Sequence, residues 1–120
     1  MVKLVFCCRR KPDMSVEEFQ RRWLDVHGPL VRKLRAKLPM MKRYVQSHTL
    51  PGPMNDELAK GRGTAPAYDG ITEVWFDDLA SMAGEGEDAA AAGRALFEDE
   101  AEFIDFARSS VFLTVEHEIF

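Results

Sequence analysis

The sequence lacks several features that would assign it to a protein class at once. It has two cysteines and three histidines, and none of them shows the spacing of a metal site. It has no apolar run long enough to cross a bilayer, and its first residues do not resemble a signal peptide. The formal net charge is −4, so there is no basic surplus for nucleic acid. We therefore expect a reduced, cytoplasmic protein with no metal, nucleic-acid or membrane partner.

The sequence does contain enough apolar material for one folded domain over residues 1–120. Hydrophobic residues make up 46% of the chain, and no internal repeat is visible. The densest basic run, residues 32–37, is interrupted by Leu34 and Ala36, and we interpret it as the solvent-facing side of a helix.

An amphipathic helix is predicted to begin after Ser15 and to be interrupted at Pro29. Ser15 opens a capping box, and apolar residues recur every three or four positions over residues 16–30. Because Pro29 has no N–H and restricts the residue before it, Gly28 is expected to leave the helix. His27 lies beside this break. It is either an acid/base group or a buried histidine that satisfies the freed carbonyl groups.

The other elements follow from alternating and helical patterns. Strands are expected over residues 2–8, 41–49, 71–76 and 111–119, and helices over 16–26, 29–37, 79–82, 89–97 and 100–106. Residues 50–67 form a long connection that is disordered or a lid, with a short helical turn near residues 56–60. This order predicts an α+β, ferredoxin-like βαββαβ fold, in which helices cover one face of a four-stranded antiparallel sheet.

Both faces of the predicted sheet are apolar, although two helices can cover only one of them. A soluble monomer rarely exposes an apolar patch larger than a few hundred square ångströms, so we expect the open face to pack against a second copy in a homodimer.

The order of motifs resembles the EthD-like proteins of the dimeric α+β barrel superfamily. The matching segments are Leu4-Val5-Phe6 with Arg9-Arg10-Lys11-Pro12, Phe19 with Trp23, Val26-His27-Gly28-Pro29-Leu30, Tyr44-Val45-Gln46-Ser47-His48, residues 68–77, Asp99-Glu100 and Phe103-Ile104-Asp105. The resemblance implies a ferredoxin-like subunit whose sheets pair face to face into a barrel, and it strengthens a functional role for His27. It does not select a reaction, because similar barrels include cyclases, decarboxylases or dehydratases, isomerases, cofactor-free monooxygenases and haem-degrading proteins.

A row of polar side chains on the second strand is the main candidate site. Alternation places Tyr44, Gln46 and His48 on one face, which we assign to the barrel interior by directing Val45 toward the helices. In the third strand, Glu73 and Trp75 are assigned to the barrel, because Val74 and Phe76 suit the helix layer. A buried Glu73 needs a partner, for which His48 or Tyr44 is expected.

These residues lead to a hypothesis of a cofactor-independent enzyme that acts by acid/base chemistry on a small hydrophobic or aromatic molecule. Its roles are proton transfer (His27, His48), substrate orientation (Tyr44, Gln46, Glu73), an aromatic wall (Trp75, Phe6) and a movable cover (residues 50–67). Isomerisation, cyclisation, dehydration and decarboxylation all remain open. The main alternative is a non-catalytic binding or accessory protein of a degradation pathway. Haem binding through a histidine, or a purely structural polar network, are further alternatives.

Overall fold

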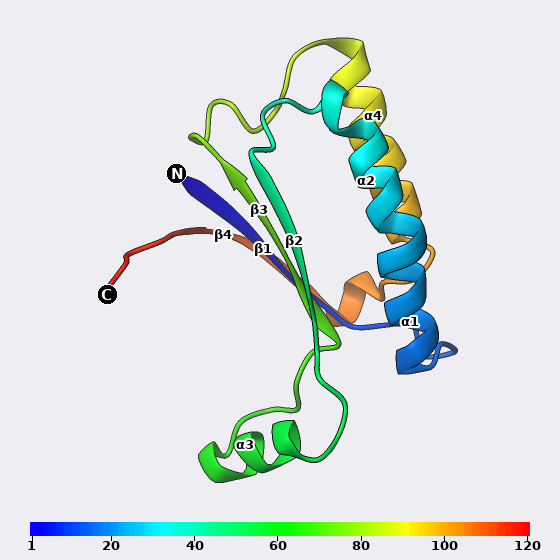
Figure 1. Cartoon of the computed structure of the whole chain (residues 1–120), viewed down its shortest axis with the longest axis vertical. Coiled ribbons are helices and arrows are strands. Elements are labelled where there is room, and N and C mark those ends of the chain that lie inside the picture. Colours follow the sequence, from blue (N-terminus) through cyan, green and yellow to red (C-terminus); the bar gives the residue numbers. More distant parts are fainter.

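Four strands form one antiparallel sheet in the order β2-β3-β1-β4, and three of the helices, α1, α2 and α4, lie against one of its faces (Figure 1). The computed structural model describes residues 1–120. Its strands are β1 (Val2–Cys8), β2 (Arg43–His48), β3 (Gly70–Phe76) and β4 (Ser110–Val115), and its helices are α1 (Val16–Arg22), α2 (Gly28–Leu34), α3 (Met54–Arg62) and α4 (Gly86–Glu100). This arrangement confirms the predicted ferredoxin-like α+β fold. None of the helices has the length and apolar character needed to cross a bilayer.

The predicted helix break at Pro29 takes the form of a π-helix. Residues Trp23–His27 form a single π-helical segment that joins α1 to α2, and the Gly28 N–H donates to the Trp23 carbonyl. Gly28 keeps right-handed helical angles, with φ −55° and ψ −51°, so the expectation that it leaves the helix is wrong. The wider turn accommodates the missing N–H of Pro29 while the chain continues in nearly the same direction.

The face assignment of β2 is also wrong. Tyr44 pairs with Val74 and Gln46 pairs with Thr72 in the antiparallel register, so each pair shares one face of the sheet. Val74 and Thr72 are buried under the helices. The row of Tyr44, Gln46 and His48 therefore lies beneath the protein's own helix layer. Val45 was predicted to face the helices, but it lies on the open face with Glu73.

The larger of two core clusters lies between the helices and the sheet, where Cys8, Phe19, Trp23 and Phe103 are almost completely buried. The Trp23 indole stacks on the His48 ring, with centroids 4.4 Å apart and planes 12° apart. Only 14 of the 120 residues are buried, because the whole open face of the sheet is uncovered in the single subunit. The subunit therefore has a small core for its length.

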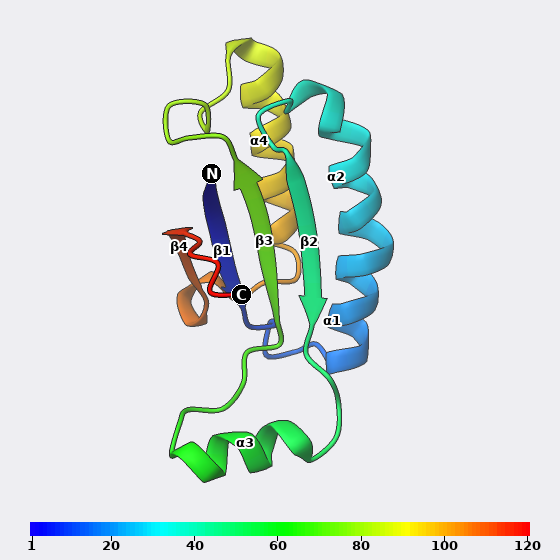
Figure 2. The same ribbon diagram turned by 60° about the vertical axis from the view of Figure 1, so that its left-hand side comes forward.

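The connection between β2 and β3 contains a helix that lies apart from the rest of the subunit. Helix α3 projects beyond the end of the sheet at which β2 finishes (Figure 2). The predicted short turn is thus a nine-residue helix. Two smaller expectations also fail. Residues 79–82 form a turn and not a helix, and hydrogen bonds between Asp78 and Ser81 close this turn. The helix predicted over residues 100–106 does not form, because α4 ends at Glu100.

Candidate functional site

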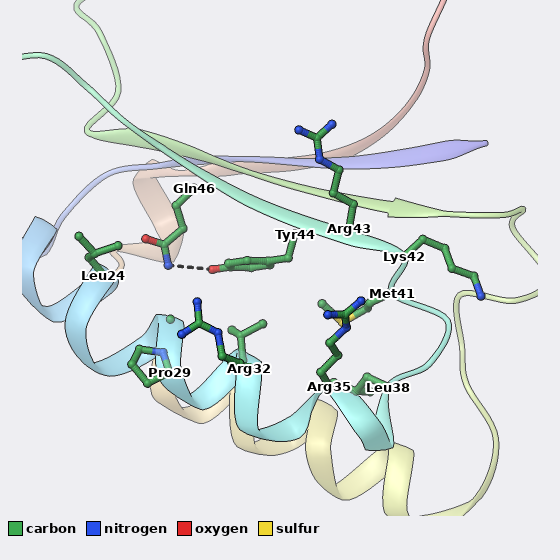
Figure 3. A pocket seen from close by; sticks show the side chains of 12 residues that line it. Leu24, Pro29, Arg32, Arg35, Leu38, Met41, Lys42, Arg43, Tyr44 and Gln46 are labelled. Carbon is green, nitrogen blue, oxygen red and sulfur yellow. Dashed lines mark hydrogen bonds between the residues drawn. The ribbon is translucent and has the colours of Figure 1, made fainter.

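A cavity with a volume of about 610 Å³ lies between α2 and β2 (Figure 3). We call it the α2–β2 cavity. Its lining consists of Leu24, Gly28, Pro29, Val31, Arg32, Arg35, Leu38, Met41, Lys42, Arg43, Tyr44 and Gln46. An adjoining hollow of about 540 Å³ shares Arg32, Arg35, Met41 and Lys42 with it. Because β2 is an edge strand, this site is accessible from the side of the subunit.

The phenol of Tyr44 and the amide of Gln46 form the polar part of the sheet side of the cavity. The Gln46 Nε2 group donates to the Trp23 carbonyl at 3.0 Å and to the Tyr44 hydroxyl at 3.1 Å. The Trp23 carbonyl is the one that accepts the π-helical bond from Gly28. The helix break and the polar row are therefore joined at a single backbone group.

His48 lies behind Gln46 and not at the cavity surface. Its Nε2 atom is 2.8 Å from Gln46 Oε1, and since an amide oxygen can only accept, His48 Nε2 carries the proton. Burial lowers the pKa of His48, which favours this neutral form. Burial also raises the pKa of Tyr44, whose hydroxyl therefore keeps its proton and can donate it to a ligand.

His27 belongs to a second buried group, which joins the helix break to the end of α4. Its Nδ1 atom lies 2.7 Å from Asp99 Oδ2, and Arg22 holds both oxygens of the same carboxylate at 2.5 and 3.1 Å. The imidazole is only 2% exposed and meets Phe103 edge-on. His27 does not line the α2–β2 cavity. Of the two interpretations of His27 given by the sequence, the buried histidine agrees with these surroundings. The partner of His27 is a carboxylate, however, and not a freed carbonyl group.

Charge balance in this second group depends on its two adjacent carboxylates. The hydrogen bond from Arg22 lowers the pKa of Asp99. Burial, with a smaller contribution from the Asp99 charge, raises the pKa of Glu100 to about 7. The Glu100 carboxyl lies 3.8 Å from His27 Nε2, outside hydrogen-bond distance. Burial lowers the pKa of His27, so the group is Asp99 carboxylate, neutral imidazole and an easily protonated Glu100.

Comparison with known proteins identifies the family. A family model described as the EthD domain matches residues 11–107. The chain belongs to the EthD domain family. A comparison with curated proteins finds no match.

Solved structures similar to this EthD-domain protein share its fold at low sequence identity. An EthD family protein from Bacillus halodurans is 22% identical with a TM-score of 0.61, and the match covers 98% of this chain and 99% of that one. A dimeric ferredoxin-like protein of unknown function from Bacteroides fragilis is 14% identical with a TM-score of 0.60, covering 96% and 95%. A dimeric ferredoxin-like protein of unknown function from Thermobifida fusca is 16% identical with a TM-score of 0.55, covering 96% and 90%.

The remaining predicted site residues of this EthD-domain protein do not meet in one place. Glu73 and Trp75 lie on the open face, as predicted, but the partner of Glu73 is Lys3 at 2.7 Å and not His48 or Tyr44. Phe6 lies on the opposite face, where it packs against the helix-side core. Phe6 and Trp75 therefore cannot form one wall.

Residues 50–67 were predicted to form a movable cover over the site. They do not line the α2–β2 cavity, so they do not cover it in this subunit. The sequence also did not single out Arg32, Arg35 and Asp99 for a role. Arg32 and Arg35 are one helical turn apart, which is the spacing that places two side chains on one face. The packing of α2 and of the 3-10 turn after it places both side chains on the cavity side, whereas the sequence pattern alone predicts that they face solvent.

Proposed function

We propose that this EthD-domain protein binds a small, apolar, carbonyl-bearing molecule in the α2–β2 cavity and polarises it through Tyr44. The observation that carries the proposal is the position of the Tyr44 phenol in the lining of a cavity of about 610 Å³. Leu24, Leu38 and Met41 supply apolar contacts for the body of the molecule.

The chemistry of the proposal rests on how Tyr44 is held. Its oxygen accepts the Gln46 amide, so its proton is free to point at the carbonyl oxygen of a ligand. A hydrogen bond that strengthens as the carbonyl becomes an enolate favours loss of the α-proton to water. Enolate formation is a step shared by isomerisation, aldol-type cyclisation and decarboxylation. In this step Tyr44 supplies the hydrogen-bond donor and water accepts the proton.

The two predicted catalytic histidines receive indirect roles in this proposal. His48 fixes the orientation of the Gln46 amide, which in turn orients Tyr44, so His48 is a positioning residue. His27 holds the π-helical segment against α4 through Asp99. Neither ring faces the cavity, and this gives the haem alternative no support.

Exchange of the α-hydrogens of 1-tetralone for deuterium, followed by NMR, tests the proposal. We expect the protein to speed the exchange and Tyr44→Phe to slow it about 100-fold, because the donor to the developing enolate is lost. Binding of 1-tetralone, measured by saturation-transfer NMR, should be nearly unchanged. His48→Ala should slow the exchange with little change in KM. Equal exchange by the protein, Tyr44→Phe and His48→Ala would contradict these roles.

The rival function is binding without turnover, as in an accessory protein of a degradation pathway. It is favoured by the absence of carboxylate and imidazole groups from the cavity lining, which leaves no strong base beside the ligand. The same experiment separates the two functions. Binding of 1-tetralone without faster exchange supports the rival function. If 1-tetralone neither binds nor exchanges faster, both functions are contradicted.

We further infer that two copies pair through the open face of the sheet. Phe112 and Ile71 are 47% and 37% exposed on this face, and beside them lie Val5 and Val45. Burial of such side chains stabilises association. The dimeric descriptions of two similar ferredoxin-like structures are consistent with this pairing.

Sedimentation velocity at micromolar concentration tests this pairing. The unmodified protein should sediment as a dimer. Phe112→Lys should sediment as a monomer, because the ammonium would be buried in an apolar interface without a partner. Val26→Lys is the control, since Val26 is 49% exposed within the helix layer. A dimer that survives Phe112→Lys would place the contact elsewhere.

A further inference from the structure

We propose that the ligand of the α2–β2 cavity is an organic anion, whose oxyanion is bound by the guanidinium groups of Arg32 and Arg35. This inference rests on the proposed function, because it takes the α2–β2 cavity as the ligand site. It adds the class of ligand: an apolar or aromatic body that carries a carboxylate or a similar oxyanion.

The first observation is the sign of the charge around the cavity. Four of the twelve lining residues are arginine or lysine, and none is aspartate or glutamate. The whole chain has the opposite balance, with 20 acidic and 16 basic residues. A cavity of one sign in a protein of the other sign raises the local concentration of ligands of opposite charge. The cavity therefore attracts anions.

The second observation is that Arg32 and Arg35 are the cations available to a ligand. Arg32 extends from α2, and Arg35 extends from the 3-10 turn that follows α2, both toward the β2 side of the cavity (Figure 3). Neither forms an ion pair or a side-chain hydrogen bond within the subunit. The other two basic residues of the lining are already engaged. Lys42 lies 3.7 Å from Asp77, and the Arg43 guanidinium stacks on Trp75 at 4.7 Å.

The third observation is the distribution of groups within the cavity. The two guanidinium groups extend from the helix side, the phenol of Tyr44 comes from the sheet side, and Leu24, Leu38 and Met41 supply apolar surface. A guanidinium presents paired N–H donors that match the two oxygens of a carboxylate. A ligand bound in this way is oriented with its anionic end at α2 and a second polar group at Tyr44.

Two fluorescent probes that differ by one anionic group test the inference. 8-Anilinonaphthalene-1-sulfonate carries a sulfonate, and N-phenyl-1-naphthylamine has the same aromatic body without it. We expect the sulfonate to bind more tightly to the unmodified protein. The double variant Arg32→Gln and Arg35→Gln should weaken sulfonate binding about tenfold or more, because charge-assisted hydrogen bonds are lost. Its affinity for the neutral probe should stay the same.

The matched control is the double variant Lys33→Gln and Lys37→Gln. It removes the same charge from the same helical region at positions that do not line the cavity. It should leave the affinity for both probes unchanged within about twofold. An equal loss of sulfonate binding in both double variants would overturn the inference, since the effect would then come from overall charge.

The outcomes also separate this inference from the proposed function. If both probes bind with equal affinity and the arginine variant changes neither, the cavity is a ligand site but the anion inference fails. If neither probe binds, and 1-tetralone does not bind, the α2–β2 cavity is not a ligand site and both proposals fail.

Discussion

Gly70→Ala is expected to destabilise the protein by about 3 kcal/mol or more, because an added Cβ has closer contacts at Gly70 than at any other glycine. A Cβ atom at Gly70 would overlap the Trp23 indole and lie 2.9 Å from the Ser47 carbonyl oxygen. The indole has no free space into which to move, because it is stacked on His48 and packed against Phe19. Either β3 or the helix layer must shift.

Urea unfolding measures this loss, and Gly93→Ala provides the control. An added Cβ at Gly93 meets nothing within 4 Å, and the residue lies in the middle of α4. The control should therefore stabilise the protein by about 0.5–1 kcal/mol through helix propensity. Similar stability of Gly70→Ala and the unmodified protein would show that Trp23 does not pack on β3 as described.

Asp99→Ala is expected to cost about 3 kcal/mol at neutral pH, because it leaves both Arg22 and His27 without their acceptor. The hydrogen bond from Arg22 lowers the pKa of Asp99 in the folded protein below its value in the unfolded chain. The carboxylate therefore contributes stability above the ordinary aspartate pKa, and this contribution is lost as the pH falls through the folded-state pKa.

The decrease in the free energy of unfolding that Asp99→Ala causes should consequently be largest at pH 7 and smaller near about pH 3. Urea unfolding at the two pH values measures it. Glu98→Ala is the control, because Glu98 is exposed on the same helix and makes no ion pair. A deficit that does not change with pH would mean that the missing side chain acts through packing and not through its charge.

The fold and the break at Pro29 could be predicted from the sequence because they depend on local chemistry. The residues on either side of Pro29 have strong helical periodicity, and proline removes one hydrogen bond wherever it occurs. The form of the break could not be predicted. A π-helical turn and a true interruption both remove that bond, and the packing of Trp23 against the sheet favours the turn.

The position of the polar row could not be deduced from β2 alone. Tyr44, Gln46 and His48 alternate with Val45, so the pattern fixes which residues share a face but not which face is covered. The antiparallel register decides this, since Tyr44 pairs with Val74. The assignments of Tyr44 to the open side and of Val74 to the helix side were therefore incompatible. The assignment of Tyr44 was wrong because polar side chains were not expected under the helices. The helix break makes this position possible, since it supplies the row with a buried acceptor, the Trp23 carbonyl.

The two neighbouring cysteines of β1 have a practical consequence. Cys8 is completely buried, and burial raises its pKa to about 12, so its thiol resists alkylation until the chain unfolds. Cys7 points to the opposite side of the sheet, beside Ile71 and within the surface that we assign to subunit pairing. Alkylation counted by mass spectrometry can thus follow global unfolding through Cys8 and dissociation of paired subunits through Cys7, in one sample.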